Sequence, residues 1–298
     1  MSLLYKNIRL KRIKVNSKRA DISYVLKEGD LLELYINDEF FSQADKIPVA
    51  PLLFSTADFE MAYEDANILI ADKKPGLVVH PDNRSQNSSL IDMIRYYLYE
   101  KGEYDPQREH SFAPALCNRI DRNTGGLVIV AKNAAALREM NEKIKERQVT
   151  KKYICAVFGS MEKESGLLTA HLKRDMHLKK VDISHKKSPE FKEINTSYEV
   201  LEQKSGISLL EVTLITGRTH QIRAHLAASG NPVIGDPKYG DKIKNIKYPK
   251  RYQALYAYKL SFDFSKAPST LAYLHGLTVM CNKVDFIHEL GFQYKFEL

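Results

Sequence analysis

The sequence predicts an α+β protein with a largely antiparallel mixed sheet, preceded by a small N-terminal module. From about residue 59 onward, strand-like and helix-like segments mix without the strict strand–helix–strand order of parallel α/β proteins. The chain has 298 residues, of which 44% are hydrophobic, enough for a sizeable core. The start of the chain shows only one helix and two short strands, too little to bury a core alone.

The N-terminal module is expected to span residues 1–40. Apolar residues at helical spacing predict a helix at its start. Alternation over 12–16 predicts a half-buried strand, and the apolar stretch 31–36 predicts a second strand after a Gly-containing turn. Residues 41–58 contain two prolines and show no clear periodicity, so they are interpreted as a linker.

The larger domain, residues 59–298, is expected to form the main sheet. Short apolar runs predict strands over 68–71, 76–79, 127–131, 151–158 and 208–215. Helices are expected over 90–100, after a cap at Asn133, and between a cap at Thr219 and a stop at Gly230. No internal repeat and no Gly-rich phosphate-binding fingerprint is present in the sequence.

The charge of the chain points to a polyanionic partner. Its net charge is +8, and residues 1–19 hold seven Lys or Arg and no acid. Two later stretches, near 173–192 and 236–251, are also rich in lysine. Clustered positive charge favours nucleic acid, because each neutralised phosphate releases condensed counterions. A merely soluble basic surface is the alternative, and charge alone does not decide between the two.

Several classes of protein are disfavoured by composition. The three cysteines are far apart and form no CxxC pair, which argues against a disulfide framework or a thiolate metal site and fits a reducing cytoplasm. No apolar run approaches the roughly 18 residues of a membrane-spanning helix, and the N-terminus lacks the apolar segment of a signal peptide.

The first candidate site is Arg119-Ile120-Asp121-Arg122, just before the apolar strand at 127–131. A carboxylate between two guanidinium groups stays ionised and can act as a nucleophile or a base. An Asx turn with incidental surface charges fits the same residues. The second candidate is Tyr153, which shares a strand face with Cys155 and Val157. It could stack on a base, or it could be an ordinary core residue.

The densest polar cluster is 216–225, at a helix N-terminus. Free backbone N–H groups there attract anions, and His220 and Arg223 share one helix face. A zinc site is disfavoured because His220 and His225 are five residues apart and no HExxH motif is present. The alternative is a solvated polar face.

Three stretches together resemble the RluA-type family of RNA pseudouridine synthases. They occur in that family's order, with a Lys-x-Tyr strand between the second and third, and the similarity runs from about residue 60 to the C-terminus. The resemblance implies the pseudouridine synthase fold for residues 59–298. The stretches are 72–81 (DKKPGLVVHP), 119–132 (RIDRNTGGLVIVAK) and 216–240 (TGRTHQIRAHLAASGNPVIGDPKYG).

The resemblance also implies roles for individual residues. Asp121 matches the catalytic aspartate, Tyr153 the tyrosine that packs on the target base and helps move the proton from carbon 5, and Arg223 the arginine that pairs with the aspartate. Two positions depart from the usual pattern, since Asn118 stands where the family has histidine and Gly125 where it has serine. Neither is the nucleophile, so activity is still expected.

The N-terminal module resembles the α-L RNA-binding motif, and it starts midway, at the motif's second helix. Arg119 matches a position that, in a relative, helps fill the gap left by a flipped nucleotide. The residues expected to contact RNA are Arg119, Arg122, Arg218, His220 and Gln221 in the larger domain, and Lys6, Arg9 and Arg12 in the module.

The expected function is therefore conversion of specific uridines in RNA to pseudouridine. The target is expected in large-subunit ribosomal RNA, with transfer RNA as an alternative, and the enzyme is expected to be a cytoplasmic monomer. The reaction breaks and remakes a base–sugar bond without redox change, so neither cofactor nor metal is expected. Two alternative hypotheses are a non-catalytic RNA-binding assembly factor and a metal-dependent RNA hydrolase. The hydrolase lacks ligands at metal-binding spacing.

Overall fold

The computed structural model divides the chain into two compact units, Met1–Leu53 and Phe54–Leu298. Lys6 and the expected linker over 41–58 lie outside the described residues. Within the described part of the chain, no helix is both long and apolar enough to span a membrane. The structure describes residues 7–19, 21–35, 59–81, 89–109, 112–175, 180–264 and 269–296.

The first unit contains a three-stranded antiparallel sheet in the order β2-β1-β3. The two strands expected from the sequence are confirmed as shorter segments, and β2 was not anticipated. Residues 7–9 are helical, whereas the start of the expected helix lies outside the described residues. Ile13 and Val15 are buried here. The strands are β1 (Ile13–Val15), β2 (Lys18–Arg19) and β3 (Leu32–Leu34).

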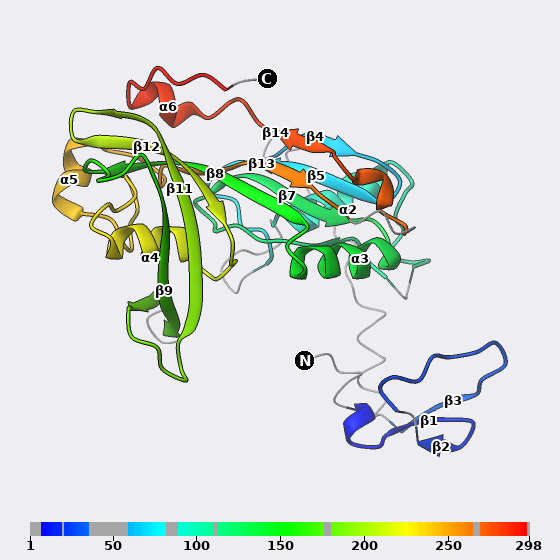
Figure 1. The fold of residues 1–298 in the computed structure, drawn as a ribbon. Coiled ribbons are helices and arrows are strands. Elements are labelled where there is room, and N and C mark those ends of the chain that lie inside the picture. The colour runs from blue at the N-terminus through cyan, green and yellow to red at the C-terminus, as the bar shows by residue number, and fades with distance from the viewer. Residues whose placement is uncertain are drawn as a thin grey trace. The chain divides into compact units, whose positions relative to one another are not determined.

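The second unit is built on an 11-stranded sheet, which confirms the expected α+β class (Figure 1). Its main path is β10-β9-β11-β12-β8-β13-β7-β5-β4, with β14 on β13 and β6 on β7. Among the described pairs only β13 and β7 run parallel, so the sheet is mostly antiparallel. The strands are β4 (Phe59–Glu64), β5 (Ile68–Lys73), β6 (Ala115–Leu116), β7 (Gly125–Ala131), β8 (Val149–Phe158), β9 (Ser165–Asp175), β10 (Lys180–Ser184), β11 (Lys192–Lys204), β12 (Ile207–Leu214), β13 (Leu255–Phe262) and β14 (Thr278–Met280).

Helices cover both faces of this sheet. On one face, α2 and α4 pack on the side chains that include Tyr153 and Cys155. On the other face, α3 packs on β5 and β7, and α6 packs on β8 and β12. The remaining helices are short. The helices are α2 (Leu90–Glu100), α3 (Ala134–Lys145), α4 (Gln221–Ala228), α5 (Lys242–Lys247) and α6 (Asp285–Glu289), with a 3-10 turn η4 (Ala272–Leu274).

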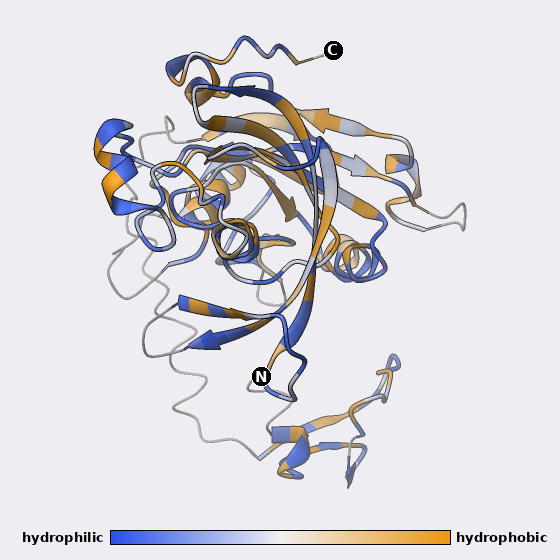
Figure 2. Cartoon of the chain, turned by 60° about the vertical axis from the view of Figure 1, so that its left-hand side comes forward, coloured by the Kyte–Doolittle hydropathy of each residue, from blue (hydrophilic) through white to orange (hydrophobic). Residues whose placement is uncertain are grey.

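Burial alternates over much of the long ribbon of β9 and β11, in which apolar and polar residues are interspersed (Figure 2). Its buried side chains, which include Ala170 and Ile194, form a small cluster with Ala224 of α4. Antiparallel strands with one covered face show this period of two. The ribbon therefore holds α4, and with it the segment 216–225, against the sheet.

The helix expected over 90–100 is confirmed as α2, and Asn133 caps α3 by accepting a hydrogen bond from the Ala136 N–H at 2.9 Å. The cap expected at Thr219 is wrong, because α4 begins at Gln221 after His220, whose φ is 55°. The amide oxygen of Gln221 instead accepts from the Arg218 N–H at 3.1 Å. A side chain of the first helical residue thus holds the turn before α4, and no side chain caps the helix.

The strand expected over 76–79 is also wrong. Gly76 has a φ of 98°, which a regular strand does not allow, and Val78 makes only an isolated bridge with Ser89. The Gly76 N–H donates to the Arg122 carbonyl oxygen at 2.8 Å. This apolar stretch is therefore a loop that is bonded to the candidate site.

Candidate active site

The loop that carries Asp121 runs from β6 to β7 and is held on several sides. The buried side chain of Ile120 anchors it in the core. The Thr124 N–H closes a turn onto the Asp121 carbonyl at 3.1 Å, and the Thr124 hydroxyl accepts from the Gln253 side chain at 2.7 Å. The loop is therefore fixed before any substrate binds.

Lys73, at the end of β5, is a buried residue that holds this loop by a hydrogen bond to its backbone. Its side chain is fully buried, and its Nζ donates to the carbonyl oxygens of Lys74, Leu77 and Arg122 at 2.9, 2.8 and 3.0 Å. Burial lowers its pKa to about 7, and the charges of Asp121 and Asp72 oppose that shift. Three carbonyl acceptors match the three donors of an ammonium group, so they favour its charged form.

We expect the Lys73→Met variant to lose stability and activity together. Three carbonyl groups would lose a partner in hydrogen bonds that are partly buried, which should lower the free energy of unfolding by about 3 kcal/mol. The Arg122 carbonyl is next to Asp121, so turnover should also fall, by roughly 10-fold or more. Chemical denaturation and a turnover assay measure the two effects. Lys163→Met, at an exposed lysine, is the control, and equal behaviour of the two variants would contradict the bracing role.

Gly126 is where β7 approaches β13 most closely. Its φ is 116°, and a Cβ there would overlap the backbone carbonyl of Ala257. Gly125, where the RluA-type pattern usually has serine, has no room for a Cβ either, because the Tyr256 ring and Pro75 occupy the space. A serine at position 125 would therefore require the ring of Tyr256 to move.

We expect Gly126→Ala to lower the free energy of unfolding by at least about 2 kcal/mol, from backbone strain and overlap combined. The matched control is Gly102→Ala. Gly102 also has a positive φ, 72°, but no atom lies within 4 Å of its Cβ position. Urea denaturation measures the free energy of unfolding of both variants. Gly102→Ala introduces backbone strain alone, so any further loss in Gly126→Ala comes from atomic overlap. If Gly126→Ala were no worse than Gly102→Ala, close packing of the two strands would be refuted.

Asp121 belongs to a chain of three charged side chains. Arg223 of α4 donates from an Nη atom to Asp121 Oδ2 at 2.7 Å. Its other two nitrogens bind Asp236, with Nε 2.6 Å from Oδ2 and Nη2 2.8 Å from Oδ1. Arg223 and Asp236 are buried, whereas the side chain of Asp121 is 23% exposed. Only the carboxylate of Asp121 is thus open to a substrate.

The pKa values of Arg223 and Asp236 keep both of these buried groups charged. Burial alone would lower the pKa of Arg223, but Asp236 and Asp121 outweigh it and raise the pKa. Burial likewise raises the pKa of Asp236, and the hydrogen bonds and charge of Arg223 outweigh this and lower it. A guanidinium that binds one carboxylate bidentately is fixed in orientation. It therefore presents its remaining nitrogen to Asp121.

His220 lies on the open side of Asp121. Its Nε2 is 3.9 Å from Asp121 Oδ1, and its Nδ1 is 2.9 Å from the Tyr239 hydroxyl. Tyr239 also accepts from the Val181 N–H at 2.9 Å, which fixes the hydroxyl. Burial, together with Arg223 and Lys238, lowers the pKa of His220 in spite of Asp121. The imidazole is therefore neutral near pH 7, and it lines the cavity beside the Asp121 carboxylate.

Tyr153 of β8 belongs both to the core and to the site. It is 6% exposed and packs with Cys155 and Val157 on the α2–α4 face of the sheet, as the alternation indicated. It also lines the same pocket as Asp121. Burial, and then the charge of Asp121, raises the pKa of its hydroxyl. The ring is thus a fixed, neutral surface in the pocket.

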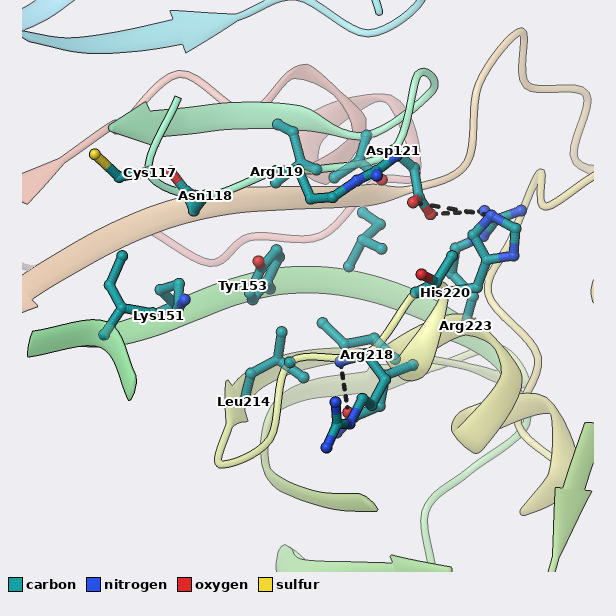
Figure 3. Close-up of a pocket in the computed structure, with 18 residues that line it drawn as sticks. Cys117, Asn118, Arg119, Asp121, Lys151, Tyr153, Leu214, Arg218, His220 and Arg223 are labelled. Carbon is teal, nitrogen blue, oxygen red and sulfur yellow. Dashed lines mark hydrogen bonds and ion pairs between the residues drawn. The ribbon is translucent and has the colours of Figure 1, made fainter. Parts of the chain in front are cut away.

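These side chains line a cavity of about 280 Å³. Figure 3 shows Asp121, His220 and Arg223 at one end, Tyr153 in the middle, and Lys151 with Cys117 at the other end. An elongated pocket with an ionised carboxylate at one end and an aromatic ring along its length can hold a planar base whose attached sugar meets the carboxylate.

The family model for RNA pseudouridylate synthase matches residues 67–228, which is more than half of the chain. The match includes the first two motifs completely and the start of the third. The chain belongs to this family. The RluA-type resemblance is thereby confirmed, and the chain is an RNA pseudouridine synthase enzyme.

Relatives and solved structures agree with this assignment. An uncharacterised RNA pseudouridine synthase of Mycoplasma genitalium is 34% identical, covering 89% of this chain and 82% of its own. Ribosomal large subunit pseudouridine synthase C of Vibrio cholerae is 29% identical, over 81% and 72% of the two chains. The solved human RNA pseudouridylate synthase domain containing 4 shares the fold, with a TM-score of 0.62 at 21% identity, covering 79% of this chain and 94% of its own.

The residues predicted to contact RNA fall into two groups in the synthase. Arg119 and Arg218 are exposed and line the cavity, as His220 does at its partly buried position. Arg122 is exposed but is not among the cavity-lining residues. In the first unit, Arg9 and Arg12 are exposed.

Gln221 also lines the cavity, but its amide is bonded within the protein. It is 2% exposed. Its oxygen accepts from Thr216 Oγ1 and the Arg218 N–H, and its nitrogen donates to the Asn195 carbonyl and Thr196 Oγ1, all within 3.1 Å. The side chain therefore shapes the turn that precedes α4.

Sequence reasoning missed three side chains of the synthase site, Lys73, Asp236 and Tyr239. Asp236 and Tyr239 lie in the segment GDPKYG of the third motif, and Lys73 lies in the first motif. The motifs therefore included these residues, but the sequence did not predict their hydrogen bonds. Among the described residues, no group of three or more His, Cys, Asp or Glu side chains is placed to hold a metal ion.

Proposed function

We propose that this synthase converts uridines of large-subunit ribosomal RNA to pseudouridine, with Asp121 as the nucleophile. The observation that carries the proposal is the buried Asp236–Arg223 pair. This pair orients the partly exposed carboxylate of Asp121 at one end of the cavity that Tyr153 also lines. A relative named as a ribosomal large subunit enzyme supports the choice of RNA. Attack on the sugar and attack on carbon 6 of the base both fit this arrangement.

Each side chain would have a defined task. Asp121 forms the bond to the substrate, and Arg223 orients it through their hydrogen bond. Tyr153 packs on the base, which must leave its stack at a cost of about a few kcal/mol. Its raised pKa keeps the hydroxyl protonated before the base arrives. Tyr153 can then help to carry the proton away from carbon 5.

Binding of the strand would rest on exposed cations. Arg119 and Arg218 lie at the cavity, Arg122 follows Asp121 in the same loop, and Arg9 and Arg12 belong to the basic first unit. We propose that residues 1–40 act as an α-L module that contacts the RNA backbone. Contacts of this kind weaken as salt rises. A ribosomal RNA substrate also leads us to propose a cytoplasmic, monomeric enzyme.

The test is a map of pseudouridines in total RNA from cells with and without the gene, by chemical marking and sequencing. Loss of one or a few sites in large-subunit ribosomal RNA, restored by the wild-type gene but not by Asp121→Asn, is the expected result. Loss confined to transfer RNA would replace the proposed substrate. If every site persisted and the purified enzyme left bare RNA unchanged, a non-catalytic assembly factor would be the better description.

A further inference from the structure

Lys151 is a cavity residue to which the proposed reaction has not yet given a task. It lies on β8 two residues before Tyr153, so both side chains leave the same face of the strand. Both line the cavity. In Figure 3 Lys151 lies at the end remote from Asp121, with Tyr153 between them.

Among the residues that the structure describes, no carboxylate lies close enough to Lys151 to raise its pKa. Figure 3 places Cys117 and Asn118 at the Lys151 end of the cavity. Burial raises the pKa of the Cys117 thiol, and the Asn118 amide oxygen already accepts from the Ile129 N–H at 2.7 Å. Burial lowers the pKa of Lys151, with no carboxylate to oppose the shift. Across the described part of the chain, no hydrogen bond or ion pair engages its ammonium group.

The next residue provides the contrast. Lys152 leaves the opposite face of β8 and places its Nζ 2.5 Å from Glu211 Oε1. A partly buried cation is usually paired in this way, because an unpaired charge away from water is costly. An unpaired ammonium that lines a substrate cavity therefore indicates that the substrate supplies its acceptor.

The positions of Asp121 and Lys151 at opposite ends of the cavity indicate which uracil atom would contact Lys151. If Asp121 reacts next to the base–sugar bond, N1 of the uracil lies at the Asp121 end and the ring extends along Tyr153. Of the two uracil carbonyl oxygens, O2 adjoins N1, whereas O4 lies across the ring. We propose that Lys151 is a further catalytic residue, whose ammonium group donates a hydrogen bond to O4 of the target uracil. This assignment rests on the proposed function.

The contact would contribute to base selection. A lysine ammonium is a donor only, so it accepts a carbonyl oxygen as its partner. Uracil presents a carbonyl oxygen at this position, while cytosine presents an amino group that is itself a donor. A cytosine in the cavity would place two donors face to face, and the ammonium would again lack an acceptor.

The contact would also stabilise charge during the reaction. When the N1–C1′ bond breaks, its electron pair remains on the base, and the negative charge is shared by N1, C5 and the carbonyl oxygens. An ammonium fixed at O4 stabilises that charge. If Asp121 holds C1′ at this stage, the C5–C1′ bond then forms from the pair on the base as the bond from C1′ to Asp121 breaks, which restores the carboxylate. The proton on C5 is lost to water and N1 takes up a proton, so the product is an isomer of the substrate. Lys151 keeps its own proton throughout.

The experiment compares two RNA oligonucleotides, both containing the uridine identified by the map, one of them with 4-thiouridine at that position. Sulfur is a weaker acceptor than oxygen, so the wild type should turn over the thio substrate about tenfold more slowly. Lys151→Met should lower turnover of the normal RNA by roughly 10²–10³-fold. It should also reduce the thio penalty to less than about twofold, since the contact is already absent.

Two further variants separate contact from structure. Lys151→Arg keeps a donor and should retain both partial turnover and the thio penalty. Lys152→Met, one residue away on the other face, should retain the full thio penalty whatever its effect on stability. Release of tritium from carbon 5 measures turnover, and thermal unfolding monitors the fold.

The assignment would be overturned by an unchanged thio penalty in Lys151→Met. It would also be overturned by a loss confined to KM, which would indicate a phosphate contact. A wild-type enzyme that converts neither RNA would instead overturn the proposed function, and this assignment with it.

Discussion

Replacing Asp121 with asparagine is expected to lower turnover by at least about 10⁴-fold while RNA binding is retained. Asparagine keeps the size of the side chain, and its amide oxygen can still accept the 2.7 Å hydrogen bond from Arg223. It lacks the negative charge that makes the carboxylate a nucleophile. Tritium release from carbon 5 and a gel-shift titration measure the two properties.

The control for this variant is Asp182→Asn, at an exposed aspartate of β10. It makes the same chemical change away from the cavity and should leave turnover within about twofold of wild type. If Asp121→Asn kept turnover within tenfold of wild type, Asp121 would not be the nucleophile. If it lost RNA binding as well, its effect on turnover would have to be measured at saturating RNA.

Replacing Arg223 with methionine is expected to cost both stability and turnover. The variant would leave Asp236, whose side chain is fully buried, without its bidentate partner, and it would release Asp121. Breaking a buried pair in this way lowers the free energy of unfolding by about 3–5 kcal/mol. Urea denaturation measures the loss, and Arg174→Met, at an exposed arginine of β9, is the control.

A second substitution distinguishes the two consequences. Adding Asp236→Asn to Arg223→Met removes the stranded buried charge, so part of the stability should return. Turnover should stay low, because Asp121 still lacks its orienting cation. Recovery of turnover in the double variant would refute the orienting role of Arg223, and unchanged stability in Arg223→Met alone would refute the buried pair.

The same pair predicts a dependence on acid. The pKa of Asp236 is lowered in the folded protein, so its contribution to stability is present above the unfolded value of about 4. That contribution is lost as the pH falls through the lower, folded value. The wild type should therefore lose more stability than the double variant Arg223→Met/Asp236→Asn between pH 5 and pH 2, by the order of 1–3 kcal/mol.

The elements predicted correctly from sequence have strong local patterns. Helix α3 has both a capping asparagine and an apolar stripe, and β7 is apolar throughout, since both of its faces are buried. The ribbon of β9 and β11 escaped prediction because its buried positions are few and an apolar residue, Leu167, lies among its exposed ones. Its order comes from pairing with distant strands, and a local pattern does not record such pairing.

The start of α4 and the loop at 76–79 were mispredicted for one common reason. In both places a long-range hydrogen bond replaces the local one. The turn before α4 is held by Gln221, which also reaches the backbone of Asn195, and the loop at Gly76 is held by the carbonyl of Arg122. Capping signals and apolar runs describe only neighbours in sequence.

The sequence alone determined the family, the candidate residues Asp121, Tyr153 and Arg223, and the α+β class, because motif order and periodicity are properties of the chain itself. Only the tertiary structure decided how these residues are held. Asp121 and Arg223 are 102 residues apart, and Asp236 and Lys73 complete the site through hydrogen bonds that exist only once the sheet has formed. The reason is that burial, which sets the charge state and orientation of each group, is a property of the folded whole.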